Sequence, residues 1–255
     1  MPLSVARSLA NVREVDIRGL GLIDLTDLDL ALYTPLWHQG QRGDTFNSMD
    51  PNRHLCSVTG ALWTSRGRDF DGVDDKISVP HHTAIDITTG DFSVGAWVDL
   101  ETVGAVAQVI LWKSLNEAPW TGYYLYFSAT DGYFMGGLDP GLATDVAITD
   151  SIRHAGTGYQ FYFMTVDRDN ATGMKLFFNG EEVASGDPTT ASDSLANTNS
   201  LYLGVLRDGS SNPFDGLIGE VWIYRRALTL LEIQRNYLAT RRTYIDIPRT
   251  LAVVR

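Results

Sequence analysis

The sequence predicts an all-β protein, a sandwich of two antiparallel sheets with one short helix near the C-terminus. Three observations support this fold class: residues 92–100 alternate apolar and other side chains, residues 174–184 form a hairpin pattern, and roughly a dozen short apolar segments follow one another at similar spacing. Many short strands with a single late helix are typical of sandwiches, and they exclude a doubly wound sheet with alternating helices.

The segment 92–100 is the clearest expected strand. Side chains of a strand point alternately to its two faces, and one face of this segment carries only apolar residues: Phe92, Val94, Ala96, Val98 and Leu100. In the hairpin, Asn179 and Gly180 provide the two positive φ angles of a type I′ turn. Other strands are expected at residues 32–37, 68–72, 76–80, 106–112, 122–128, 133–138, 159–166, 200–206 and 217–224.

The expected helix begins with a capping box, in which the side chains of Thr229 and Glu232 each satisfy a backbone N–H of the first turn. Arg241 and Arg242 follow later, and their positive charge suits a helix C-terminus. The spacing of apolar residues predicts that the helix presents one apolar stripe, made of Leu230, Ile233, Tyr237 and Leu238.

The chain of 255 residues is long enough for one large β domain. We expect the sandwich to span residues 29–242, between an N-terminal arm at 1–28 and a C-terminal tail at 243–255. The arm has scattered apolar side chains, too many for a solvated tail and too irregular for an independent domain. Because apolar segments of this kind are usually buried, both ends are expected to clasp neighbouring subunits.

Twenty basic and 31 acidic residues give a formal charge of −11. This charge disfavours nucleic acid and anionic membranes as partners, because no cluster of Lys and Arg offsets it locally. Cys56 is the only cysteine, which excludes an intramolecular disulfide. The N-terminus lacks the apolar region of a secretory signal, and no apolar run is long enough to span a membrane. The chain is therefore expected to be made in the cytoplasm and to reside on the surface of a virion or another particle.

Four motifs, in order along the chain, resemble those of laminin-G-like, concanavalin A-like lectin-glucanase jelly-roll domains. They lie at residues 70–75 (FDGVDD), 92–98 (FSVGAWV), 173–181 (GMKLFFNGE) and 214–233 (FDGLIGEVWIYRRALTLLEI). The resemblance covers residues 30–242 and is absent at both ends. It implies a jelly-roll sandwich in which the strands of Phe70 and Phe214 lie side by side. It does not determine function, since this fold carries lectins, adhesion modules, glycan hydrolases and capsid parts.

Catalysis is not expected. Glycan hydrolases of this fold need carboxylates at alternating positions of one strand, so that one acts as acid and another as nucleophile in a single cleft. No Glu-x-Asp-x-x-Glu strand occurs, Asp99 and Glu101 have no third partner, and no Gly-x-Ser-x-Gly nucleophile motif is present. The five histidines lack the spacing of a metal site and are expected at the surface or in loops.

A calcium site is one hypothesis for the acidic residues of the two Phe-Asp-Gly motifs. If these strands pair, Asp74 and the three proposed ligands come together, namely Asp71, Asp75 and Asp215. Hard cations take several oxygen ligands at once, and the family resemblance implies calcium near such loops. The alternative, which we favour, is that these carboxylates cap turns by accepting hydrogen bonds from nearby backbone N–H groups.

Trp120 is the loop aromatic best placed to bind a sugar ring. Sugar recognition needs an exposed aromatic face together with fixed polar groups. The residues expected to join Trp120 in such a site are Asn116, Asp208 and Asn212, with Ser210, Tyr123 and Tyr124 nearby. Because tyrosines are also common in sandwich cores, Tyr124 or Tyr126 is expected to face inward.

These observations leave three functions open. The first is a non-enzymatic coat, decoration or appendage protein of a phage-like virion, whose arms bind further copies of the chain or other virion proteins. The second is a carbohydrate-binding or adhesion module, with glycans as partners. The third is a glycan hydrolase. Arms in contact with other chains favour the first function, whereas a ligand in the loop cleft of an isolated monomer favours the second.

Overall fold

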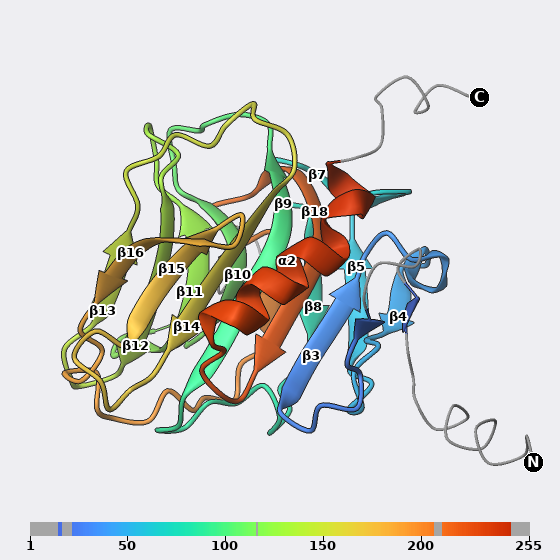
Figure 1. The fold of residues 1–255 in the computed structure, drawn as a ribbon. Helices are drawn as coiled ribbons and strands as arrows, with labels where there is room; N and C mark the ends of the chain where they lie inside the picture. Colours follow the sequence, from blue (N-terminus) through green and yellow to red (C-terminus); the bar gives the residue numbers. More distant parts are fainter. Residues whose placement is uncertain (1–14, 17–21, 116, 207–210, 246–255) are drawn as a thin grey trace, which may run out of the picture.

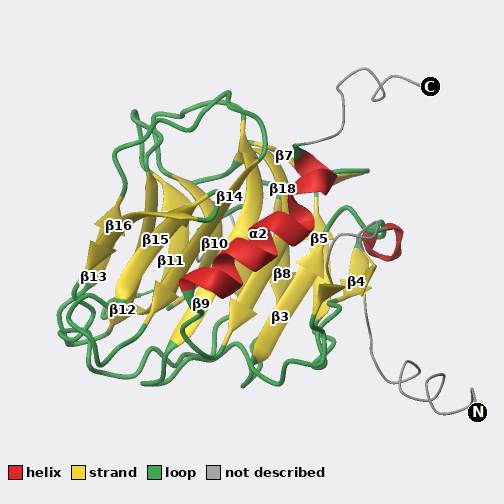
Figure 2. Ribbon diagram, viewed as in Figure 1, coloured by secondary structure: helices red, strands yellow, loops and turns green. Residues whose placement is uncertain are grey.

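The computed structural model describes residues 15–16, 22–115, 117–206 and 211–245. Two antiparallel sheets stack as a sandwich, and one helix lies across the outer face of one of them (Figure 1, Figure 2). The predicted fold class is confirmed. Most of the expected arm, and residues 246–255 of the expected tail, lie outside the described residues. Within the described part of the chain, no helix is long and apolar enough to cross a membrane.

Among the described residues, the elements form a long series of strands followed by one α-helix. In chain order they are β1 (Val15–Asp16), β2 (Leu22–Ile23), β3 (Leu30–Pro35), the 3-10 turn η2 (Gln39–Gln41), β4 (Thr45–Asn47), β5 (Leu55–Thr59), β6 (Leu62–Thr64), β7 (Gly67–Asp71), β8 (Lys76–Val79), β9 (Phe92–Leu100), β10 (Gln108–Ser114), β11 (Thr121–Phe127), β12 (Phe134–Pro140), β13 (Val146–Thr149), β14 (Gln160–Val166), β15 (Met174–Phe178), β16 (Glu181–Gly186), β17 (Leu201–Leu203), β18 (Asp215–Tyr224) and α2 (Leu230–Tyr244).

The first large sheet, which we call the β10 sheet, has the strand order β13-β12-β11-β10-β17-β8-β5-β4. The second, the β9 sheet, has the order β16-β15-β14-β9-β18-β7-β6, and β3 pairs with the C-terminal half of β18. Strands β7 and β18 are neighbours, with Phe70 opposite Gly216. The rings of Phe70 and Phe214 lie 6.0 Å apart. The predicted pairing of the two Phe-Asp-Gly strands is therefore confirmed.

The main core lies between the two sheets. The predicted apolar face of β9 is confirmed, because every residue of it packs in this core: Phe92, Val94, Ala96, Val98 and Leu100. The other face of β9 is apolar at Trp97, which is fully buried in a second cluster beneath α2. The β9 sheet is thus covered on both sides, as strands with apolar residues on both faces require.

The hairpin between β15 and β16 turns at Asn179 and Gly180, whose φ angles are 51° and 85°. Phe178 and Glu181 face each other across the turn. Two positive φ angles in a two-residue loop define the predicted type I′ turn, which is confirmed. The Asn179 side chain also accepts a hydrogen bond from the Phe161 N–H at 3.0 Å, which ties the turn to β14.

The capping box of α2 at Thr229 and Glu232 is confirmed, but the predicted apolar stripe is wrong in half of its members. Leu230 and Leu238 are exposed, and half of the buried residues of α2 are polar, namely Asn236, Thr240 and Thr243. The aromatic residues beneath it present polar groups that need partners. The Thr240 hydroxyl accepts a 2.6 Å hydrogen bond from the Trp97 indole N–H.

A buried carboxylate lies beneath the C-terminal end of α2. Glu220 of β18 accepts hydrogen bonds from the hydroxyls of Tyr33 (3.0 Å) and Tyr244 (3.1 Å) and from the Trp37 indole N–H (2.8 Å). Burial raises the pKa of this carboxyl to about 7, although the three donors act in the opposite direction. The contacts join β3, β18 and α2 on the covered face.

The expectation that the histidines lie at the surface or in loops is confirmed, since all five lie in loops or turns, but His154 is buried within its loop. Its side chain is buried against Phe178, and its Nε2 lies 2.7 Å from a carboxylate oxygen of Asp150. The residue does belong to the connection between β13 and β14, but that connection packs against the strands. Spacing along the sequence contains no information on which connections are covered in this way.

Candidate functional site

Strand β10 directs a tryptophan away from the main core because it contains a β-bulge. Its pairing with β11 shifts register between Val109 and Leu111, so that β10 has one extra residue. As a result Ile110 and Leu111 both pack between the sheets, whereas Val109 and Trp112 belong to a separate cluster on the outer face. The bulge places Trp112 opposite the next strand's Tyr124.

The outer face of the β10 sheet carries a small aromatic stack. The rings of Trp112 and Tyr124 are parallel to within 10° with centroids 4.5 Å apart, and Tyr126 lies 5.6 Å from Tyr124. Gly137 of β12 faces Tyr124 across the strands. A Cβ atom at Gly137 would lie 2.3 Å from the Tyr124 ring, so this position needs glycine for the ring to lie flat on the sheet.

A pocket of about 290 Å³ lies over these three rings. Two of the predicted sugar-binding residues line it: Trp120, whose surface is 43% exposed, and Asn212. The other two predicted residues, Asn116 and Asp208, lie outside the described residues. The structure therefore brings Trp120 and Asn212 to one pocket, although they are far apart in the sequence.

The prediction that Tyr124 or Tyr126 faces the core is wrong, because both line the pocket. The tyrosine that faces inward is Tyr123, whose hydroxyl donates to the Ile85 carbonyl at 2.8 Å. The run of aromatic residues in β11 gives no signal that distinguishes the two faces. Pairing with the neighbouring strands decides which residues of β11 face outward, and the bulge in β10 contributes to this register.

Hydrogen bonds hold both ends of the pocket in place. Asn212 has a φ of 53°, its side chain donates to the Ala107 carbonyl at 3.0 Å, and its own carbonyl accepts from the Val109 N–H at 3.2 Å. At the other end, the Trp120 carbonyl accepts from the Gly141 N–H at 3.0 Å. Both residues are thus positioned by backbone contacts to neighbouring strands or turns.

The pocket combines aromatic surface with oxygen atoms. Asp139 of β12 is buried at its edge, and Asp145 of the following turn is exposed. Burial, followed by the nearby charge of Asp139, raises the pKa values of Tyr124 and Tyr126. The two tyrosine hydroxyls therefore remain protonated donors, next to carboxylates that accept hydrogen bonds.

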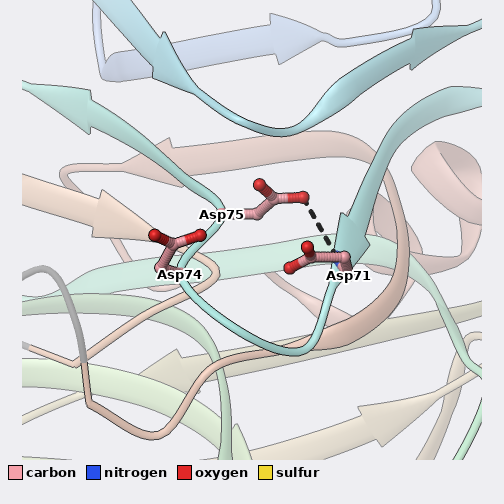
Figure 3. A group of neighbouring side chains, drawn as sticks. All are labelled: Asp71, Asp74 and Asp75. Carbon is pink, nitrogen blue, oxygen red and sulfur yellow. Dashed lines mark hydrogen bonds between the residues drawn. The ribbon is translucent and has the colours of Figure 1, made fainter.

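A second candidate site is a group of three carboxylates at the end of β7 (Figure 3). Asp71, Asp74 and Asp75 each place a carboxylate oxygen within 4.8 Å of the others. The Asp71 side chain accepts from the Val73 N–H at 2.9 Å, and the Asp75 side chain accepts from the Asp71 N–H at 3.0 Å. The favoured turn-capping role is confirmed for these two residues.

The same three carboxylates also suit a hard cation, which takes oxygen ligands from carboxylates and water. Burial raises the pKa of Asp75, and the charges of Asp71 and Asp74 add to this effect. Asp215, the third predicted ligand, pairs with Asp71 in register but does not belong to the group of three. Its carboxylate accepts a hydrogen bond from the Thr102 hydroxyl.

The sequence was compared with models of known protein families. The model described as the concanavalin A-like lectin/glucanases superfamily matches residues 71–234, more than half of the chain. The chain belongs to this superfamily. The resemblance inferred from the four motifs is confirmed. No curated protein matches the sequence.

Solved structures share the lectin-like sandwich. They include the binding domain of Paraclostridial Mosquitocidal Protein 1 (TM-score 0.67, 15% identity), a Botulinum neurotoxin serotype D ligand binding domain in complex with N-acetylneuraminic acid (0.64, 14%) and a Trypanosoma rangeli sialidase in complex with 2,3-difluorosialic acid (0.63, 16%). The alignments cover 84%, 82% and 84% of this chain but 52%, 50% and 33% of those chains. The present chain thus matches about half or less of each, and identity this low shows the common fold alone.

Sequence analysis of this superfamily member missed several residues of the pocket, among them Trp112, Tyr126, Asp139 and Asp145. Trp112 ends an apolar run at residues 109–112, and neither this run nor the sequence around the two carboxylates signals a place in the pocket. Asp139 reaches the pocket because β12 lies beside β11, and Asp145 follows in the connection after β12.

Proposed function

We propose that this chain is a non-enzymatic glycan-binding module whose binding site is the pocket on the outer face of the β10 sheet. The main support is the composition of the pocket: three aromatic rings on the sheet, Trp120 at one end, and the carboxylates of Asp139 and Asp145 beside them. Further support comes from the similar solved structures, which include toxin binding domains and complexes with sialic acid compounds.

The chemistry of sugars fits this lining. One face of a pyranose ring carries mostly C–H groups, which pack against aromatic rings, while its hydroxyls need hydrogen-bond partners. In this pocket the rings of Trp120 and Tyr126 supply apolar surface, and the tyrosine hydroxyls and carboxylates supply donors and acceptors. A pocket with apolar and polar groups on different sides therefore orients a sugar as well as binding it.

The experiment is a glycan array probed with the purified full chain, followed by calorimetric titration with the array glycan that binds best. Trp120→Ala is expected to weaken binding about tenfold, since loss of one stacking ring costs on the order of 1.4 kcal/mol. The matched control is Leu62→Ala, which removes an exposed apolar side chain from β6 of the other sheet and leaves binding unchanged. Glycan binding that is insensitive to Trp120→Ala contradicts the proposed site.

The absence of catalysis is part of the proposal and has its own test. The sequence contains no strand with the spaced carboxylates that hydrolases of this fold use. After prolonged incubation of the full chain with the best array glycan, mass spectrometry is expected to show only intact glycan. The appearance of a shorter product that Asp139→Asn abolishes would establish a hydrolase.

A role on a virion surface is the finer form of the proposal. It is supported by the apolar side chains of the sequence at residues 3–22 and 245–254, segments that suit attachment to neighbouring subunits. Deletion of residues 1–14 is expected to leave the circular dichroism spectrum and glycan binding unchanged while it abolishes assembly, measured by sedimentation. If the deletion variant assembles like the full chain, residues 1–14 do not mediate attachment, and the glycan-binding function stands without a virion role.

A further inference from the structure

The walls of the pocket come from separate segments and surround it on four sides. Along the strands, Trp120 lies at the end where β11 begins, while Ala107 and Asn212 lie at the other end, where β10 begins. Across the strands, Leu206 follows β17 on one flank, and Asp145 in the β12–β13 turn lies on the other. Residues of the lining therefore stand at both ends of the path along the strands.

The residues at both ends, together with the small volume, limit what the pocket accepts. A sugar chain bound through its interior needs a groove with two open ends, because the chain continues in both directions. Hydrogen bonds from the N–H groups of Val109 and Gly141 to the carbonyls of Asn212 and Trp120 anchor the backbone of both end walls, and the Asn212 side chain is held by the Ala107 carbonyl. With a volume of about 290 Å³, the pocket lies at the lower limit of ligand sites, which run from roughly 300 to 1,000 Å³.

We propose that the pocket recognises the terminal residue of a glycan and not an internal stretch of a polysaccharide. This inference rests on the proposed glycan-binding function and specifies its substrate class. The terminal ring packs against Trp120 and Tyr126, and the carboxylates of Asp139 and Asp145 accept hydrogen bonds from its hydroxyls. The linkage to the rest of the glycan leaves through the side of the pocket that faces solvent.

The first experiment measures competition for the best array glycan on the full chain. The competitors are the methyl glycosides of glucose, galactose, mannose, N-acetylglucosamine and N-acetylneuraminic acid, together with the same array glycan after an exoglycosidase has removed its terminal sugar. The methyl glycoside of that terminal sugar is expected to displace the glycan completely. Removal of the terminal sugar is expected to weaken binding more than tenfold.

Two failures of this experiment have different meanings. If binding depends on Trp120, but no methyl glycoside competes and the trimmed glycan binds as well as the intact one, the terminal-residue inference is overturned and the glycan-binding function stands. If no glycan binds, or if binding does not depend on Trp120, the proposed function itself fails and the inference falls with it.

A second experiment opens one end wall. Asn212→Gly removes a wall side chain at a φ of 53°, which glycine adopts without strain. Wild-type protein is expected to bind at least tenfold more weakly to array glycans in which a further sugar extends the recognised residue, and Asn212→Gly is expected to recover part of that loss. The control is Asn179→Gly, at a φ of 51° in the other sheet, which leaves the preference unchanged. Equal binding of extended and unextended glycans by wild type overturns the inference.

Discussion

Both sheets of the sandwich carry aromatic side chains on their outer faces, but in the described part of the chain a helix covers only one of these faces (Figure 1). On the β9 sheet, Trp97, Phe161 and Trp222 are fully buried beneath α2. On the β10 sheet, Trp112 and Tyr124 form a smaller cluster, and the pocket lies over them. The same kind of residue thus has two different surroundings within one fold.

This difference indicates that aromatic residues on the outer face of a sheet form a binding surface only where no other part of the chain covers them completely. The helix on the β9 sheet provides apolar contact and also polar partners, such as Thr240 for the Trp97 indole. On the β10 sheet, turns surround the aromatic residues at Trp120, Asp145 and Asn212 without closing over them. Apolar area that remains in contact with water there is available to a ligand.

The largest expected effect is a difference in the free energy of unfolding lost when a tryptophan is removed from each of the two regions. Trp222→Ala beneath α2 is expected to lower the free energy of unfolding by about 4 kcal/mol, because it removes a fully buried aromatic side chain. Trp120→Ala is expected to cost less than about 1 kcal/mol, because its side chain is substantially exposed. Urea denaturation measures both values. Similar losses for the two variants would show that the faces do not differ as described.

The second effect concerns the buried carboxylate of Glu220 on the covered face. Its pKa rises from 4.5 to about 7 on folding, so the folded chain binds this proton more tightly than the unfolded chain. The resulting stabilisation is fully present below pH 4.5 and is lost as the pH rises through 7, a change of about 3 kcal/mol at most. Melting of wild type and Glu220→Gln across pH 4 to 8 measures this difference. If the two curves run parallel, Glu220 does not titrate in this range.

The third effect concerns calcium. The calcium hypothesis, set against the favoured turn-capping role, is that Asp71, Asp74 and Asp75 bind this ion with water completing its coordination. At ten times the dissociation constant, a ligand that binds only the folded state stabilises it by about 1.4 kcal/mol. Calcium is therefore expected to raise the melting temperature, and a chelator to reverse the rise. Asp74→Asn is expected to abolish the response, and an unchanged melt of wild type with calcium leaves these residues their turn-capping role alone.

The smallest effect tests the turn at the edge of the covered sheet. Asn179→Ala is expected to lower the free energy of unfolding by about 1 kcal/mol, because a residue with a Cβ atom and no local hydrogen bond resists positive φ. Glycan binding is expected to remain unchanged, since the turn lies on the other sheet from the pocket. A melt identical to wild type contradicts the role given to this side chain.

The features that the sequence predicted correctly are those set by local patterns. The alternation of β9, the turn at Asn179 and the capping box of α2 each depend on residues close together in the chain. The family motifs added one long-range pairing, between the strands of Phe70 and Phe214. Trp120 and Asn212 were predicted for a sugar site, and the structure places both at the same pocket.

The features that the sequence did not predict depend on contacts between strands. The bulge in β10, which turns Trp112 outward, is visible only in the register with β11. Half of the buried residues of α2 are polar, and one of them, Thr240, accepts a hydrogen bond from Trp97 of the sheet beneath it, which the sequence of the helix alone does not reveal. Burial of Glu220 likewise results from Tyr33 and Tyr244, residues far from it in the chain.

The most direct test of the proposed site uses the six tryptophans of the chain as reporters. Protein labelled with nitrogen-15 at the indole positions is titrated with the best array glycan, and each indole N–H signal is assigned by a single Trp→Phe variant. The account predicts that the signals of Trp112 and Trp120 shift with the glycan, whereas those of Trp97 and Trp222 beneath α2 do not. Glycan binding that shifts the signals of Trp97 or Trp222 and leaves Trp112 and Trp120 unchanged would contradict it.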